Sequence, residues 1–271
     1  MTELLTTLLD SGDLGQYVGL FFLVAARWLP LTILAPFFAA RSMPATARLS
    51  LGFALTLLVF PAAHAASGPL PTSSTTLALL VLREALVGAL LGLVVAIPFY
   101  ALEAAGRLID SARGARMAEL LAAPTGVRTS PTGAFLLLLG VVLFLLVDGH
   151  LMVISAVGQS YRSLPVGAGL APDAPARVLP LALHLGSELL LVALGIAAPV
   201  LATAVLVDLS LGLAGRLAPR LPLYFLGLPV KGLGGVGVLL LSLSVMLWSL
   251  GGLYRLTLRA LEATLAALGA G

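Results

Sequence analysis

This chain of 271 residues has few charged residues and no cysteine. Asp, Glu, Lys and Arg together make up 10% of it, against about 25% in a typical soluble domain. Hydrophobic residues make up 60%, and the mean hydropathy is +1.11. The shortage of charge excludes an ordinary soluble domain and indicates an integral membrane protein. The absence of cysteine excludes disulfide bonds and thiolate metal sites.

The sequence also lacks the alternation of polar and apolar residues that is typical of transmembrane barrel strands. Helices are then the remaining way to satisfy the backbone hydrogen bonds in lipid. Each of six apolar runs is about long enough for one bilayer crossing of roughly 20 residues: 14–40, 49–66, 77–105, 134–157, 178–213 and 232–253. We therefore expect an all-α membrane protein with about six helices, kinked or broken by proline and glycine.

Catalytic and ligand-binding motifs are missing as well. Ser130 has neither a neighbouring His base nor a G-x-S-x-G context. Asp148 and His150 are too few ligands for a metal ion, and the glycine-rich stretch 227–237 lacks the Walker pattern. The net charge of +3 is too small to indicate nucleic acid binding. We expect no enzyme, no metal or other cofactor and no nucleic acid partner. The acidic N-terminus also predicts no cleavable signal peptide.

The longest polar interruption is the stretch 106–133, GRLIDSARGARMAELLAAPTGVRTSPTG. Glycine lies at both of its ends and proline near its C-terminal end, and its charged residues are Arg107, Asp110, Arg113, Arg116, Glu119 and Arg128. Polar, glycine-rich backbone at membrane depth is tolerated where protein or a water-filled pore surrounds it. The stretch is therefore either a surface loop or short surface helix on the membrane, or a plug or gate inside a pore.

Several ionisable residues lie within or beside the apolar runs: Arg27, Glu84, Asp148, His150, Glu188 and Asp208. Ionisable groups are costly in the bilayer, so each should face protein or water. They form either an ion or proton path or polar contacts between helices of an oligomer. In the third run Gly88 and Gly92 are four residues apart, the spacing that lets helices approach closely in lipid.

Six groups of residues follow one another in an order that resembles a known family. They are Pro36 with Pro44, Arg48 and Pro61; Glu84 with Gly88 and Gly92; the segment GRLIDSARG at 106–114; the segment SPTG at 130–133; Gly149-His150 with Ser160-Tyr161 and Pro165; and Pro199 with Asp208, Gly212, Pro219 and the segment GLPVK at 227–231. Along nearly the whole chain this order resembles the FliR/SctT family of the type III secretion export apparatus. GRLIDSARG and SPTG resemble the injectisome (virulence-type) members more than the flagellar members. Ala123-Pro124 departs from the Asp-Pro of many relatives.

The resemblance implies a structural and gating subunit of a channel that exports unfolded proteins across the bacterial inner membrane. It implies membrane partners of the P/R and Q/S types, a switch subunit at the cytoplasmic entrance and a large export-gate subunit. The helices would be arranged as hairpins, like a fusion of the two partner-subunit folds. By this resemblance we expect a helical membrane region at 1–177 containing a plug-like loop at 106–130, and a helical-hairpin region with an amphipathic tail at 178–271.

The resemblance also assigns two sets of residues. The plug or gate residues would be Gly106, Asp110, Arg113, Gly114, Met117 and Leu120. Buried charges or contacts between subunits would be Arg27, Glu84, Asp148, His150, Glu188, Asp208 and Lys231. Two alternatives stay open: a proton-coupled small-solute transporter with the carboxylates as its relay, and the flagellar member of the same family.

Overall fold

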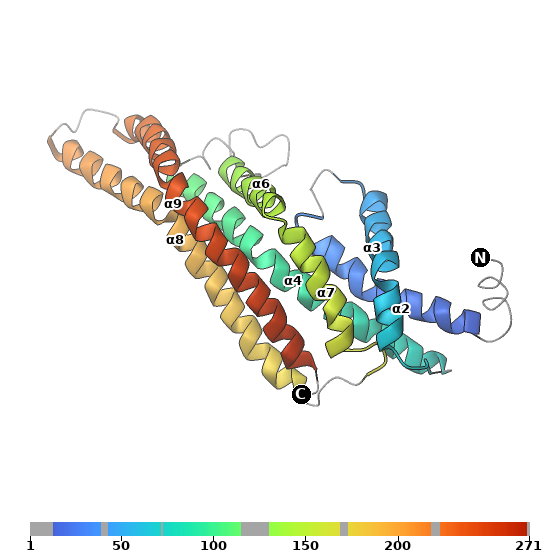
Figure 1. The fold of residues 1–271 in the computed structure, drawn as a ribbon. Helices are drawn as coiled ribbons and strands as arrows, with labels where there is room; N and C mark the ends of the chain where they lie inside the picture. The colour runs from blue at the N-terminus through green and yellow to red at the C-terminus, as the bar shows by residue number, and fades with distance from the viewer. Residues whose placement is uncertain are drawn as a thin grey trace. The chain divides into compact units, whose positions relative to one another are not determined.

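The computed structural model describes residues 13–38, 43–71, 73–114, 130–168, 173–217 and 223–269, and every regular element in these ranges is an α-helix (Figure 1). The helices are α2 (Asp13–Leu34), α3 (Ala45–Ala66), α4 (Ser74–Ala112), α6 (Pro131–Leu146), α7 (Gly149–Ser163), α8 (Ala174–Leu217) and α9 (Leu223–Leu268). The predicted all-α class is confirmed for the described part of the chain.

Four of these helices are long and apolar enough to cross a membrane, namely α2, α3, α4 and α8. A fifth span results if α6 and α7 are taken together as one broken span or a re-entrant loop. The apolar start of α9, Gly227–Ser242, is shorter. The chain is therefore a multi-pass membrane protein, with four or five candidate spans among the described residues where the sequence predicts about six helices.

Three predicted boundaries differ from the structure. The fourth apolar run is interrupted between α6 and α7, where Asp148 has a left-handed φ of 55°. The sixth run and the predicted tail form one continuous helix, α9, in whose last turns Ala260, Leu261 and Leu265 are buried. The predicted loop at 106–130 begins too early, because α4 continues to Ala112.

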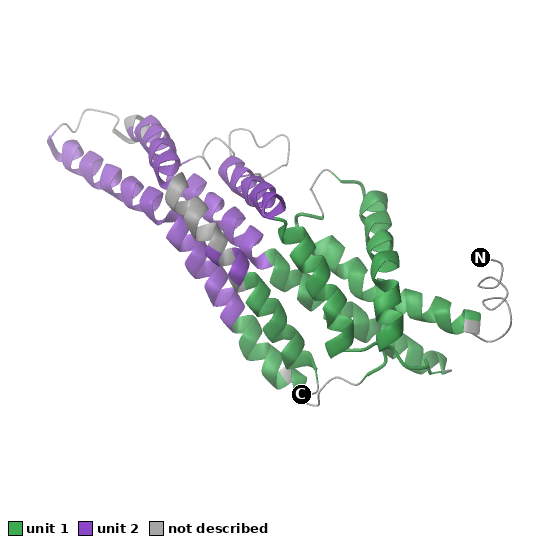
Figure 2. Cartoon of the chain, in the orientation of Figure 1, with its two compact units in different colours: residues 1–96, 148–183, 257–271 green, residues 97–147, 184–256 purple. Residues whose placement is uncertain are grey.

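The chain divides into two compact units, each assembled from separate stretches of sequence (Figure 2). Unit 1 comprises 1–96, 148–183 and 257–271, and unit 2 comprises 97–147 and 184–256. Both units contain a hydrophobic core of leucine, valine, alanine and aromatic side chains. The sequence-based division at residue 177 stays a prediction.

In unit 1, α2 packs against both α3 and α4. Tyr17 stacks on His64, and Phe21 contacts Phe53 and Phe60, so α2 and α3 run antiparallel. The predicted close approach of α4 is confirmed on its Gly88 face. A Cβ added to this glycine would lie 2.0 Å from the backbone oxygen of Arg27.

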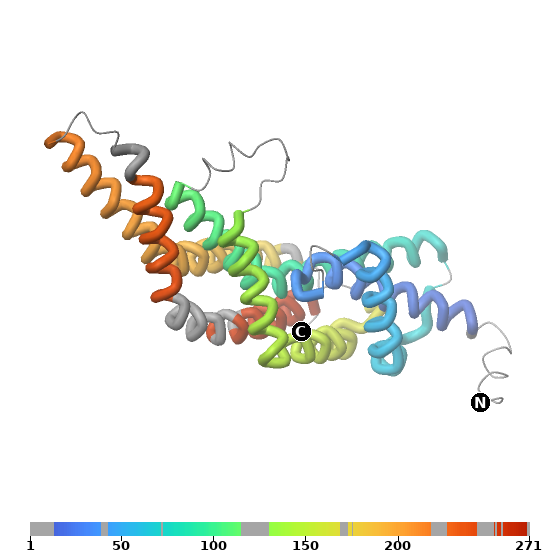
Figure 3. The backbone as a smooth tube through the Cα atoms, turned by 90° about the horizontal axis from the view of Figure 1, so that it is seen from above, coloured from blue at the N-terminus to red at the C-terminus, as the bar shows by residue number. Residues whose placement is uncertain are grey.

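Unit 2 consists of two antiparallel helix pairs. Phe99 of α4 contacts Phe144 of α6, and the C-terminal part of α8 lies beside the N-terminal part of α9 (Figures 1 and 3). The Tyr254 hydroxyl of α9 donates a hydrogen bond of 2.6 Å to the backbone oxygen of Gly140. Burial raises the pKa of Tyr254 to about 12, so its phenol remains a neutral donor at physiological pH.

Candidate functional site

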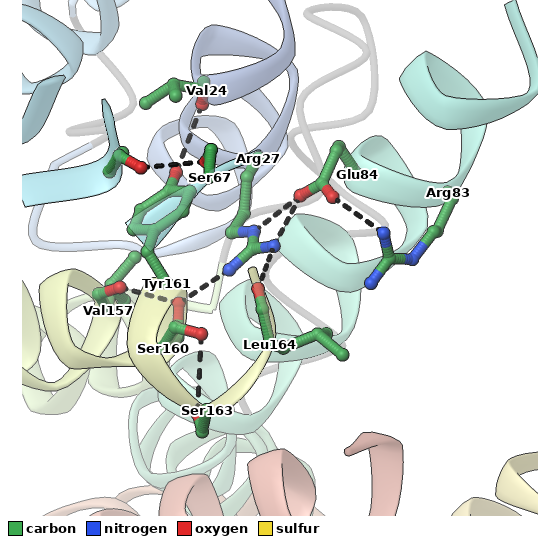
Figure 4. A network of polar contacts seen from close by, with 11 residues as sticks. Val24, Arg27, Ser67, Arg83, Glu84, Val157, Ser160, Tyr161, Ser163 and Leu164 are labelled. Atoms are coloured by element: carbon green, nitrogen blue, oxygen red, sulfur yellow. Dashed lines mark hydrogen bonds and ion pairs between the residues drawn. The ribbon is translucent and has the colours of Figure 1, made fainter. Parts of the chain in front are cut away.

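Unit 1 contains a buried network of polar contacts around Arg27 (Figure 4). Arg27 of α2 and Glu84 of α4 are both 0% exposed. The Nε and Nη2 atoms of Arg27 each lie 2.6 Å from Oε2 of Glu84. Nη1 donates to the Ser160 hydroxyl at 2.9 Å, and Nη2 donates to the backbone oxygen of Leu164 at 3.0 Å. One guanidinium group therefore joins α2, α4 and the C-terminal end of α7.

Tyr161 closes this network on one side. Its ring centroid lies 4.2 Å from Cζ of Arg27, and its hydroxyl donates to the backbone oxygen of Val24 at 3.3 Å. An ion pair removed from water is tolerated only when its remaining donors and acceptors are also satisfied. In this network all three guanidinium nitrogens of Arg27 have an acceptor, which explains how this charge is buried at membrane depth.

Arg83 is a second cation beside Glu84. Its Nη1 lies 3.4 Å from Oε1 of Glu84, its side chain is 10% exposed, and its nitrogens make no hydrogen bond. Arg27 and Glu84 are predicted from the sequence as separate buried charges, and no role is predicted there for Arg83. Ser160 and Tyr161 belong to one of the family motifs, and this motif is the signal in the sequence for their role.

Unit 2 contains a second group of polar contacts, at the two ends of the central polar stretch. We use the name loop root for residues 106–114, at the end of α4 and in the turn after it, together with residues 130–133, the N-cap and first turn of α6. The Asp110 carboxylate accepts a hydrogen bond of 2.5 Å from the Ser130 hydroxyl, and two bonds from Thr132, of 3.0 Å from its N–H and 2.5 Å from its hydroxyl. Ser130 also caps α6, since its Oγ accepts from the Gly133 N–H at 2.9 Å.

The two helices of the loop root meet backbone to backbone. A Cβ added to Gly106 would lie 2.4 Å from both Cα and N of Gly133. Arg113 extends from the end of α4 to the same place, because its Nη1 lies 3.4 Å from the Thr132 hydroxyl and 3.7 Å from Oδ1 of Asp110. The chain therefore leaves α4 and re-enters α6 at one fixed point.

The structure places the predicted plug residues in three settings. Gly106 and Asp110 belong to the last turns of α4, while Arg113 and Gly114 form the turn that follows. Met117 and Leu120 lie outside the described residues. The helix continues past Gly106 because Ile109 is fully buried in the core of unit 2, one turn beyond the buried Ala105.

The remaining predicted charges are distributed over both units. Asp208 of α8 is paired with Lys231 of α9, which fastens the α8–α9 pair within unit 2. Asp148 is exposed at the break before α7, His150 is half-buried, and Glu188 is half-buried on α8. Among the described residues no three metal-ligating side chains gather, and the absence of a metal from the whole chain stays a prediction.

Comparison with known proteins identifies the family. The model of the family described as "Bacterial export proteins, family 1" matches residues 18–256. The flagellar biosynthetic protein FliR of Pectobacterium carotovorum is 31% identical over 234 residues, which cover 85% of this chain and 88% of that protein. The Yop proteins translocation protein T of Yersinia pestis is 37% identical over 178 residues, covering 65% of this chain and 67% of that protein.

A third relative is the surface presentation of antigens protein SpaR of Salmonella typhimurium. It is 29% identical over 218 residues, covering 80% of each chain. The matched region, 18–256, contains Arg27 of α2 together with α4, α6 and α7, and therefore both the Arg27 network and the loop root. The chain belongs to the bacterial export proteins of family 1, the FliR/SctT family that the order of its motifs predicts.

Proposed function

We propose that this protein is a membrane subunit of a type III secretion export channel, through which unfolded proteins leave the bacterial cytoplasm across the inner membrane. The match of the family model over residues 18–256 carries this proposal. Relatives named for flagellar biosynthesis, for translocation of Yop proteins and for surface presentation of antigens support it. The apolar helices of the fold agree with a multi-pass membrane subunit.

Within this family, we propose that the chain is of the injectisome type rather than the flagellar type. The Yop translocation protein T is 37% identical over its matched region, against 31% for the flagellar protein of Pectobacterium carotovorum. We propose membrane partners of the P/R and Q/S types, together with the switch subunit and the large export-gate subunit. Exposed leucines support such partners, because Leu206, Leu213 and Leu233 on the α8–α9 pair are 63%, 63% and 78% exposed.

Purification in gentle detergent from cells that express the whole operon tests this proposal. We expect native mass spectrometry to find one copy of this chain with several copies of each of two smaller membrane subunits. The identity of these subunits distinguishes an injectisome from a flagellum. A lone monomer or a homodimer would contradict the proposed channel.

The loop root is proposed to hold a plug that closes the resting channel, with Gly106, Asp110, Arg113, Gly114, Met117 and Leu120 as the residues that shape it. Asp110 supports this assignment, because its carboxylate ties the end of α4 to the start of α6. A segment whose two ends are fixed at one point is suited to blocking a pore, since it cannot be drawn out from either end. Arg113 and Gly114 then mark the place where the segment begins.

Replacing residues 115–123 by a Gly/Ser linker of equal length is expected to raise the leakage of ions through the resting channel. This change leaves Asp110 and the rest of the loop root intact, so the fold should persist. Leakage is measured as the current across a planar bilayer containing the assembled complex. As a control, a Gly/Ser linker of equal length in place of residues 169–172, between α7 and α8, should leave the current unchanged. An unchanged current in the 115–123 variant would remove the plug.

The transporter alternative has less support from the structure. A proton relay needs carboxylates that can take up and release a proton, whereas Glu84 is paired with Arg27 and Asp208 with Lys231, each within its own unit. Asp148 is exposed, and its position at a helix break accounts for its polarity.

A further inference from the structure

We propose that Gly235 of α9 is a positioning residue for the loop root, because its missing side chain leaves the space in which Arg113 lies. The inference rests on the proposed function of the loop root as the base of a plug. The sequence motifs connect only α4 and α6 with the loop root. The proposal assigns a role at the same site to a third helix, α9.

Arg113 crosses α9 in close contact with Gly235. A Cβ added to this glycine would lie 2.7 Å from both Cγ and Cδ of Arg113 and 3.2 Å from its Nε. The next residue touches the same helix, since a Cβ on Gly114, where φ is 76°, would lie 2.8 Å from Cδ2 of Leu228. Residues 228 and 235 are about two helical turns apart. The turn after α4 therefore rests on one side of α9.

Packing holds Arg113 more firmly than its polar contacts do. The hydrogen bond from Nη1 to the Thr132 hydroxyl is 3.4 Å long, the oxygen of Asp110 is 3.7 Å away, and Nε is buried without a hydrogen-bond partner. Such long contacts are weak. The surface of α9 at Gly235 then decides where the guanidinium group lies relative to Asp110 and Thr132.

This arrangement connects the loop root to the α8–α9 pair. Lys231, one turn before Gly235, is paired with Asp208 of α8. A displacement of α9 along or about its axis would move the residues under Arg113, and Arg113 contacts both Asp110 and Thr132. The position of the plug would thereby depend on a helix that contributes no residue to the plug itself.

A double-mutant cycle in the assembled complex tests the proposal. Gly235→Ala should push Arg113 aside without displacing the helices, because the nearest atoms belong to a flexible side chain. We expect a several-fold rise in the resting ion current. Gly232→Ala is the matched control in the same helix, since nothing lies within 4 Å of a Cβ at that position, and its current should equal that of the unaltered complex.

Arg113→Ala should also raise the current, and adding Gly235→Ala to it should produce no further rise, because the two changes act through one contact. The same non-additivity is expected in the midpoint of thermal unfolding. Additive effects on that midpoint would overturn the positioning role, as would a Gly232→Ala variant that leaks as much as Gly235→Ala. If the 115–123 linker variant does not leak, the plug is wrong, and the thermal cycle still decides whether Gly235 positions Arg113.

Discussion

Replacing Glu84 by alanine is expected to lower the free energy of unfolding by about 3–5 kcal/mol, because it leaves the buried charge of Arg27 without its counter-ion. Arg27 is completely buried, and its two contacts of 2.6 Å to Glu84 are the shortest that it makes. Arg83, which lies 3.4 Å from the other carboxylate oxygen, would then add repulsion between two guanidinium groups. The three helices that meet at Arg27 should separate together.

The measurement is the midpoint of thermal unfolding in detergent, with the amount of protein that accumulates in the membrane. Asp173→Ala provides the control, because Asp173 and Arg177 form an ion pair whose side chains are 61% and 40% exposed. Exposed pairs contribute little, so this variant should unfold with the unaltered protein. Equal midpoints for the Glu84 and Asp173 variants would contradict the structural role of the Arg27 network.

Gly88→Ala is expected to have the next largest effect. Its Cβ would lie 2.0 Å from the backbone oxygen of Arg27, and a backbone atom cannot rotate away as a side chain can. The two helices must therefore move apart, and overpacking of this kind costs about 1–3 kcal/mol, occasionally more. The same shift would disturb the pairing of Arg27 with Glu84, so we expect a clearly lower midpoint of thermal unfolding.

Two other glycines provide a graded comparison. Gly92→Ala should be milder, since its Cβ would lie 2.9 Å from Cα of Leu31. Gly195→Ala in α8 should be neutral or slightly stabilising, because nothing lies within 4 Å and alanine favours the helix. The measurement is again the thermal midpoint in detergent. Gly88→Ala and Gly195→Ala variants of equal stability would show that α2 and α4 do not pack at this distance in the folded protein.

The sequence predicts the helical class and marks the important polar residues, but it does not show which of them meet. Arg27 and Glu84 are 57 residues apart, and hydrophobic periodicity does not reveal that α2 and α4 are neighbours. Asp110 and Thr132 are closer in sequence, at 22 residues apart, yet no sequence pattern predicts that they form a hydrogen bond. Pairing across helices is a property of packing, which one sequence read alone does not determine.

Some boundaries were available in the sequence and were missed. Asp148-Gly149 is a typical turn dipeptide, and the chain breaks there. Ser130 followed by Pro131 is a helix start signal, and α6 begins at Pro131. The opposite error concerns residues 227–231, which fall between the predicted apolar runs but belong to α9, since glycine and proline are more frequent in membrane helices than in soluble ones.

The length of α9 has a consequence for how much of the protein accumulates in the cell. Its 46 residues correspond to a contour of about 69 Å, whereas the hydrocarbon core of a bilayer is about 30 Å thick. Lipid tails alone therefore cannot cover the whole helix, although Leu233, Leu240 and Leu241 expose most of their surface. A copy synthesised in excess of its partners would present this surface to chaperones and proteases. Its abundance should therefore be set by degradation of unassembled chains rather than by its rate of synthesis.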